Sequence, residues 1–158
     1  MRTNVVLDKQ YKQKISARAT TIIDRVALTL AEYAAGVLPD ANVYIGPVRQ
    51  NVQLPAVFIR FYETVNVQML DDVSAYDFGF DIAYFPKNEL SDGELNHAMF
   101  ALQQGLYEIQ SEFGAMYCYR KNGSITDRVA HVTGQIRVME QTIPDDPIIE
   151  IADKELKI

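Results

Sequence analysis

Two histidines and a single cysteine are the side chains of this sequence best suited to metal binding or covalent catalysis. A zinc or di-iron site needs its ligands at short, defined spacings. His97 and His131 lie far apart in the sequence and form no His-x-x-x-His pair. The sequence therefore predicts solvated or hydrogen-bonded histidines and no metal site.

The cysteine is a poor candidate for a nucleophile. A catalytic thiol needs a base such as histidine within hydrogen-bonding reach. Cys118 lies between Tyr117 and Tyr119 in a segment with strand-like alternation, where a buried cysteine acts as a small hydrophobic side chain. A lone cysteine forms no intramolecular disulfide, so nothing indicates an oxidising compartment.

Carboxylates are the remaining candidates for chemistry. Asp77 and Asp81 share one face of a predicted strand, with Gly79 between them. This spacing suits an acid–base pair or a cation site, but a polar sheet face gives the same pattern and is its usual cause. The sequence holds no glycine-rich phosphate loop and no Gly-x-Ser-x-Gly elbow. We therefore expect no enzyme and no cofactor.

The elements that position these residues alternate between helices and strands. Apolar residues spaced by three or four predict a helix over 12–36, ended by Gly36 and Pro39. A second helix is predicted over 92–109, because Ser91 and Glu94 form a capping box.

Strands are indicated by alternating apolar and aromatic residues. We predict strands over 42–46, over 56–63 with a continuation through 67, over 76–85, over 116–120 and over 131–140. Turns are predicted at 71–72 and 121–124. Only the second helix is expected to serve as a crossover.

These elements predict an α+β fold with one mostly antiparallel sheet and two helices packed on one face. The length fits a single domain over 1–158. We divide it into a flexible lead over 1–11, a core over 12–142 and a C-terminal arm over 143–158.

The charge balance argues against sequence-specific binding of nucleic acid. The net charge is -6, and Lys and Arg are scattered along the chain. A DNA-binding protein usually presents a basic stripe. No uncharged stretch is long enough for a membrane span, and the first residues lack the apolar core of a signal peptide. We expect the protein to be made in the cytoplasm and to need no membrane.

Aromatic residues are concentrated on two neighbouring predicted strands. They are Phe58, Phe61, Tyr62, Tyr76, Phe78, Phe80, Tyr84 and Phe85. Core packing and cross-strand pairs explain such a set. A sheet face that meets another subunit explains it equally well, and the sequence does not decide between the two.

Several segments together resemble a known family. They are Asn-Val-Tyr-Ile-Gly at 42–46, Leu-Pro-Ala-Val-Phe-Ile-Arg at 54–60, the stretch 77–86 with its Phe-Asp-Ile-x-Tyr-Phe-Pro motif, the capped helix from Ser91, and 130–138. In this order and spacing they resemble the tail-terminator (tail-completion) family of tailed phages. The resemblance covers about 42–142. It does not cover the polar lead or the tail after Pro144.

The resemblance implies a structural virion protein. Such proteins form a ring, usually a hexamer, that caps the tail tube, ends its polymerisation and provides the surface for head joining. The implied partners are further copies of the chain, the tail tube protein, the head connector or neck protein and, in contractile tails, the sheath protein. DNA would pass the lumen without specific binding, which an acidic protein suits. The implied location is the head-proximal end of the virion tail, and the host cytoplasm during assembly.

Two other functions fit the same residues. One is a different neck or head-completion protein that binds the portal side. The other is a small-ligand-binding module on the aromatic sheet face, which predicts a concave pocket in a monomer.

Loops and termini are the expected sites of partner contact. We select a loop over 47–53, the turn over 68–74 and the C-terminal arm, which could add a strand to a neighbour's sheet edge. The individual candidates are Pro47, Arg49, Gln53, Gln68, Asp71, Asp72, Ser74, Ile149, Ile151 and Leu156.

Overall fold

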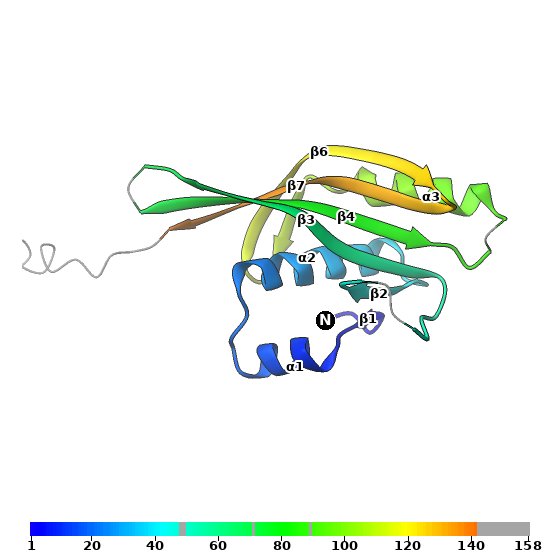
Figure 1. Ribbon diagram of the computed structural model, residues 1–158, viewed down its shortest axis with the longest axis horizontal. Helices are drawn as coiled ribbons and strands as arrows, with labels where there is room; N and C mark the ends of the chain where they lie inside the picture. Colours follow the sequence, from blue (N-terminus) through cyan, green and yellow to red (C-terminus); the bar gives the residue numbers. More distant parts are fainter. Residues whose placement is uncertain (48–49, 71, 89, 142–158) are drawn as a thin grey trace, which may run out of the picture.

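A computed structural model describes residues 1–47, 50–70, 72–88 and 90–141. In these residues the elements follow the order β1 (Val5–Val6), α1 (Lys9–Ser16), α2 (Ile22–Val37), β2 (Asn42–Ile45), β3 (Ala56–Gln68), β4 (Val73–Phe85), α3 (Asp92–Gln104), β5 (Glu108–Ser111), β6 (Gly114–Thr126) and β7 (Val129–Gln141). Figure 1 shows β3 and β4 as a long hairpin that projects beyond the helices.

All the described strands belong to one sheet, in the order β1-β2-β3-β4-β7-β6-β5. The pairs β3–β4, β4–β7, β7–β6 and β6–β5 are antiparallel, whereas β1–β2 and β2–β3 are parallel. The α+β class is thus confirmed, but the sheet is mixed. The prediction that only the second helix serves as a crossover is wrong here, because β3 begins beside the start of β2, with Ala56 opposite Asn42, and runs parallel to it.

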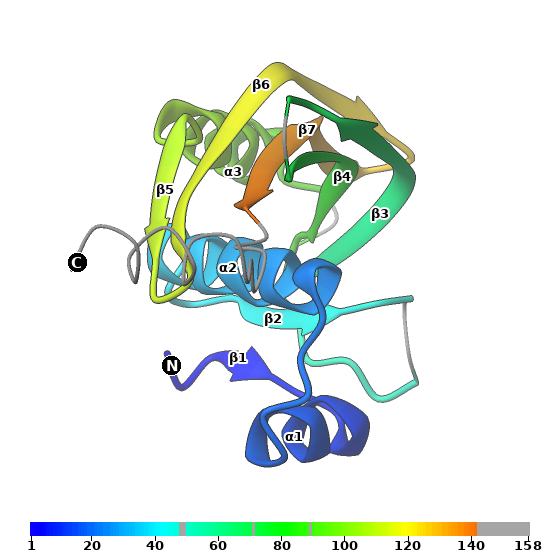
Figure 2. The ribbon, with the colours of Figure 1, turned by 90° about the vertical axis from the view of Figure 1, so that its left-hand side faces the viewer.

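The sheet curls around α2 (Figure 2). Helix α2 contacts β1, β2 and β3 and also β5, which lies at the opposite edge of the sheet. Helix α3 contacts β4, β6 and β7. The two longer helices therefore share one face of the sheet. Helix α1 is a third helix, which the prediction had joined to α2.

The core lies between these two helices and the sheet. Leu30 of α2, Leu102 of α3 and Phe80 of β4 are fully buried in one cluster. Each such side chain contributes roughly 1.5–3 kcal/mol through removal from water.

The helix predicted over 12–36 is two helices. Helix α1 ends at Ser16 and α2 begins at Ile22, with Arg18 between them at a φ of 52°. Thr21 caps α2, because its hydroxyl accepts from the Asp24 N–H and Asp24 accepts from the Thr21 N–H. The prediction was wrong because apolar residues keep a helical spacing across the break.

Two residues of the predicted flexible lead over 1–11 belong to the sheet. Val5 and Val6 pair with β2. The Asn4 side chain donates to the carbonyl groups of Ala35 and Ala41, at 3.2 and 2.9 Å. Such a short strand gives little sequence signal, because its pairing depends on a partner far along the chain.

The second helix is shorter than predicted. Helix α3 ends at Gln104 with Gly105 as its C-cap, and Ile109 belongs to β5. The Ser91 hydroxyl accepts from the Glu94 N–H at 3.2 Å, as predicted. The second hydrogen bond of a capping box, from the Ser91 N–H to the Glu94 carboxylate, is not formed. The Glu94 carboxylate accepts instead from the Tyr84 hydroxyl at 2.7 Å and from the Lys87 N–H at 2.9 Å.

The predicted turn over 121–124 is wrong. Strand β6 runs through it from Gly114 to Thr126. The register with β7 shifts between Tyr119 and Asn122, so the polar residues form a bulge. The hairpin turn is at Asp127 and Arg128, both of which have a positive φ, as a two-residue hairpin loop requires.

The remaining strand predictions are confirmed, with β2 ending at Ile45 rather than at residue 46 and the other strands longer than predicted. Strand β3 continues through Val65 and Val67, β4 begins earlier than predicted, at Val73, and β7 extends the predicted segment at both ends. Asp72 has a φ of 61° between β3 and β4. The predicted arm over 143–158 lies outside the described residues.

Candidate functional site

The sheet face opposite the helices carries two groups of paired charges. In the first group, the Asp81 carboxylate of β4 lies 3.0 Å from Nη2 of Arg60 on β3 and 3.0 Å from Nδ1 of His131 on β7. These residues are neighbours across three strands because β4 lies between β3 and β7. This group therefore links the three central strands of the sheet, β3, β4 and β7.

The second group is centred on Asp77. Arg137 donates to its two carboxylate oxygens, from Nε at 2.7 Å and from Nη2 at 2.9 Å, and the Tyr119 hydroxyl donates at 2.6 Å. The hydrogen bonds from Arg137 lower the pKa of Asp77, against a smaller opposing effect of burial. Asp77 therefore stays ionised near neutral pH and is unsuited to proton transfer.

These contacts favour a polar sheet face over an acid–base pair or a cation site. Both aspartates have cationic partners, so neither is left to bind a metal. Among the described residues, no group of three or more His, Cys, Asp or Glu side chains could hold a metal ion.

The histidines and the cysteine have the ordinary roles that the sequence predicted. His131 forms a hydrogen bond with Asp81, and His97 is exposed on α3. Glu94 precedes His97 at the i, i+3 spacing of di-iron sites, a match that we did not note from the sequence. The Glu94 carboxylate, however, accepts a hydrogen bond from the Tyr84 hydroxyl. Burial raises the pKa of the Cys118 thiol to about 12, so it is not a nucleophile at neutral pH.

Most of the clustered aromatics pack against one another rather than facing solvent. Phe58 stacks on Tyr44 and meets the edge of Phe85, and Phe61 meets Phe78. Tyr62 differs, with 61% of its surface exposed. The structure therefore supports core and cross-strand packing for most of this set.

Several exposed apolar side chains gather at the end of the β3–β4 hairpin. We define the hairpin patch as Val65, Val67, Met69, Leu70 and Met139, all of which are exposed. Val67 and Met139 flank Ala75 in one row across β3, β4 and β7. Leu70 is 87% exposed at the hairpin end. Apolar residues that gather on a surface in this way mark sites of protein interaction.

The predicted contact residues fall into two separate regions. Gln68, Asp72 and Ser74 border the hairpin patch at the end of β3 and the start of β4. Pro47 and Gln53 lie in the loop before β3, where the Gln53 carbonyl accepts from the Asn42 side chain. The structure does not bring the two regions together. Arg49, Asp71, Ile149, Ile151 and Leu156 lie outside the described residues.

The polar turn was predicted as a contact site from the sequence, whereas the apolar residues beside it were not. The available signal was the pair Met69-Leu70 next to a turn, together with strand alternation that continues through Val65 and Val67 beyond the core.

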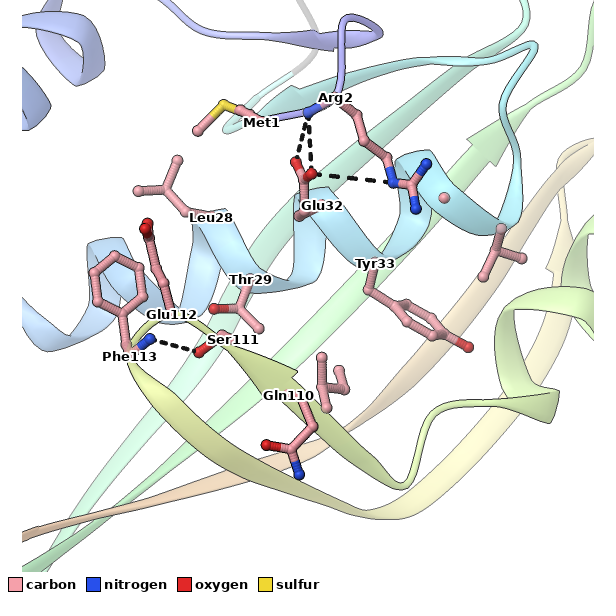
Figure 3. A pocket seen from close by; sticks show the side chains of 13 residues that line it. Met1, Arg2, Leu28, Thr29, Glu32, Tyr33, Gln110, Ser111, Glu112 and Phe113 are labelled. Carbon is pink, nitrogen blue, oxygen red and sulfur yellow. Dashed lines mark hydrogen bonds and ion pairs between the residues drawn. The ribbon is translucent and has the colours of Figure 1, made fainter.

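A groove of about 680 Å³ lies between α2, β5 and the first residues of the chain (Figure 3). On the α2 side it is lined by Leu28, Glu32 and Tyr33, among others, and Glu32 accepts from the Arg2 backbone N–H at 3.0 Å. Phe113 marks its end beyond β5, with the Arg25 guanidinium 5.3 Å from the ring centroid. The groove is thus remote from the aromatics of β3 and β4, where a ligand-binding module was expected to have its pocket.

In the part of the chain that the structure describes, no helix is long and apolar enough to cross a membrane.

Comparison with known proteins identifies the family. A family model described as phage tail terminator protein matches residues 21–148, from the cap of α2 past the end of β7. The comparison with curated proteins found no match. Because the family model covers most of the sequence, the chain belongs to the phage tail terminator family, whose role in the phage tail is structural.

Proposed function

We propose that the protein caps the phage tail tube as a ring, ends tube polymerisation and provides the surface for head joining. The observation that supports this proposal is the placement of two candidate contact regions beside opposite ends of β3. The 13 residues of β3 span about 40 Å at the usual rise of a strand. One subunit can therefore contact different partners with its two ends.

A closed ring requires two different patches on each subunit. The hairpin patch supplies one apolar surface of the kind found at the centre of protein interfaces. Its base is rigid, because the Asp77 and Asp81 groups tie β3, β4, β7 and β6 together. A rigid patch costs less entropy to bind than a flexible loop.

The net charge of -6 agrees with passage of DNA through such a ring, because like charges repel and the DNA would not be trapped. A ring whose lumen is lined mainly by Lys and Arg would contradict this part of the proposal. We expect the ring to be a hexamer.

The test is polymerisation of purified tail tube protein with and without this protein. We expect the wild type to stop growth and to give shorter tubes of narrow length distribution. Val67→Asp with Met139→Asp should lose most of this effect, because two charges are placed in the hairpin patch.

Ile15→Asp is the matched control. Ile15 is partly exposed on α1 and lies outside the region that the family model matches. It should leave capping unchanged. Wild-type protein that binds neither tube ends nor further copies of itself would refute the proposal. Binding only to the portal side would instead identify a neck or head-completion protein.

A further inference from the structure

The projecting part of the sheet is a ribbon of β3, β4 and β7 with an open edge on each side. On one side, β2 pairs with β3 only as far as Ile59, so among the described strands residues 60–68 pair with β4 alone. On the other side, β6 pairs with β7 only as far as Arg137, so residues 138–141 also pair with β4 alone. Figure 1 shows this end of the ribbon clear of the helices.

One hydrogen bond defines which backbone groups of β3 point to its open edge. The Met69 N–H donates to the Val73 carbonyl at 2.8 Å, where the hairpin closes. Successive residues of an antiparallel strand direct their N–H and C=O groups to opposite sides. The groups of Thr64, Asn66 and Gln68 therefore point away from β4 and are available to another strand.

The same alternation defines the open edge of β7. Val67, Ala75 and Met139 form one row across β3, β4 and β7. Val67 and Ala75 direct their backbone groups toward each other, so those of Met139, on the far side of Ala75, point outward. Both open edges thus offer free donors and acceptors at the same level of the ribbon.

The sequence of the β3 edge does nothing to prevent pairing with another strand. Proteins protect exposed strand edges with proline, with charged side chains or with a covering element. Residues 64–68 read Thr-Val-Asn-Val-Gln, without a charge or a proline, and all five are exposed. Such an edge is suited to pairing with a second chain.

We propose that the β3 edge of one copy pairs with the β7 edge of a second copy as parallel strands, with Val67 opposite Met139. This inference rests on the proposed ring and names the strands that join its subunits. Copies in a ring are related by rotation, so every β3 runs in the same direction. Strand β7 also runs in that direction, because β3 and β7 are both antiparallel to β4.

The backbone groups and the side chains of the two edges fit this pairing. In a parallel pair, an outward-pointing residue bonds to the two residues that flank its opposite partner. Met139 opposite Val67 would therefore bond to Asn66 and Gln68, whose groups point outward. Val67 and Met139 are 44% and 59% exposed, and the contact would cover both side chains.

Each copy would use its β3 edge toward one neighbour and its β7 edge toward the other. Contacts between two different surfaces of the same chain are those that close into a ring. The open edges therefore account for a directional contact between copies, which an apolar patch alone does not specify.

Paired cysteines test the contact in the presence of tail tubes. Val67→Cys with Met139→Cys should form disulfides between copies, because opposite Cα atoms of paired strands are about 4.8 Å apart, within the range of a disulfide. Within one chain the two positions lie two strand spacings apart, about 10 Å, which a disulfide does not span. Val65→Cys with Met139→Cys is two residues out of level and should give at least tenfold less product. Cys118 is buried, and the wild type measures its background.

The outcomes separate the pairing from the capping function. A Val67 and Met139 cysteine variant that binds tube ends without forming linked chains would overturn the proposed pairing and leave capping intact. More product from the Val65 pair would also overturn it. A wild type that binds neither tube ends nor further copies of itself would refute the pairing and the capping function together.

A backbone substitution at Asn66 is an independent test. The Asn66 N–H points away from β4, so Asn66→Pro removes a donor from the contact between copies and none from the hairpin. Asn66→Ala keeps the N–H and is the matched control. We expect Asn66→Pro to cap tubes at least tenfold less effectively than Asn66→Ala, with similar unfolding of the two isolated proteins. Equal capping by the two variants would overturn the proposal.

Discussion

Gly79 lacks a side chain where the ring of Tyr62 crosses β4. A Cβ at this position would lie 2.6 Å from Cε2 of Tyr62 and 3.1 Å from Cβ of Glu63. Tyr62 occupies the bulge between Phe61 and Glu63, and its hydroxyl donates to the Gly134 carbonyl at 3.4 Å. The ring thus bridges β3 and β7 over the glycine.

This close approach predicts coupling between the two residues. Gly79→Ala should lower the free energy of unfolding by about 1 kcal/mol, because the tyrosine ring must move. In a Tyr62→Ala background the same substitution should cost close to zero, since only the Glu63 contact remains. Chemical denaturation of the four proteins in this cycle measures the coupling, and an equal cost in both backgrounds would show that the ring is not the obstacle.

Asp77 predicts a defined pH dependence of stability. Its pKa is lowered in the folded protein, chiefly by Arg137, so its contribution is present above the unfolded pKa of about 3.9 and is lost as pH falls through the folded pKa. Asp77→Asn should therefore destabilise the protein at pH 7, and its difference from the wild type should shrink below about pH 3.9. Urea denaturation from pH 7 to pH 2 tests this expectation. A difference that is constant over this range would rule out the ion pair as its source.

The sequence predicted the kind of surface around these residues but not their partners. Alternation placed Asp77 and Asp81 on a polar face. Which cation meets each aspartate depends on the register of β4 with β3 and with β7. Register follows from pairing between strands, and Asp77 and its partner Arg137 are far apart in the sequence. The bulge at Tyr62 has the same origin.

At the scale of elements, Thr21 determines where α2 begins. Thr21→Ala should cost about 1 kcal/mol, because the Asp24 N–H loses its acceptor at the first turn. Thr21→Ser keeps the hydroxyl and should cost much less. Thermal unfolding of the two variants compares them directly, and equal losses would show that packing of the methyl group matters more than the cap.

Elements were predictable where local chemistry sets their ends. Ser91 begins α3 as expected, and the alternation of 76–85 predicts β4. The break between α1 and α2 was missed, because the apolar spacing is continuous across it. The short strands β1 and β5 were missed since a strand of two to four residues is stabilised by its neighbours rather than by its own composition.

At the scale of the whole molecule, the curl of the sheet could not be read from the sequence. It brings both edges, β1 and β5, against α2, and it leaves the β3–β4 hairpin projecting (Figure 1). The helices and the central strands predicted the α+β class. The direction of β2 relative to β3, and therefore the mixed sheet, depended on the path of residues 46–55.

The distance between the two contact regions predicts that their variants block different steps of assembly. Val67→Asp with Met139→Asp changes the hairpin patch, and Pro47→Trp with Gln53→Trp places bulk on the loop before β3. Both pairs are on the surface, so each should change the free energy of unfolding by only about 0.5 kcal/mol.

If one end of the subunit contacts the tube and ring neighbours and the other contacts the head, the hairpin variant should give overlong tubes. The loop variant should give tails of normal length that do not join heads. Electron microscopy of phage lysates complemented with each variant measures tail length and head attachment separately. The same defect from both variants would mean that the two ends serve one interface, and the proposed division of partners along β3 would then be wrong.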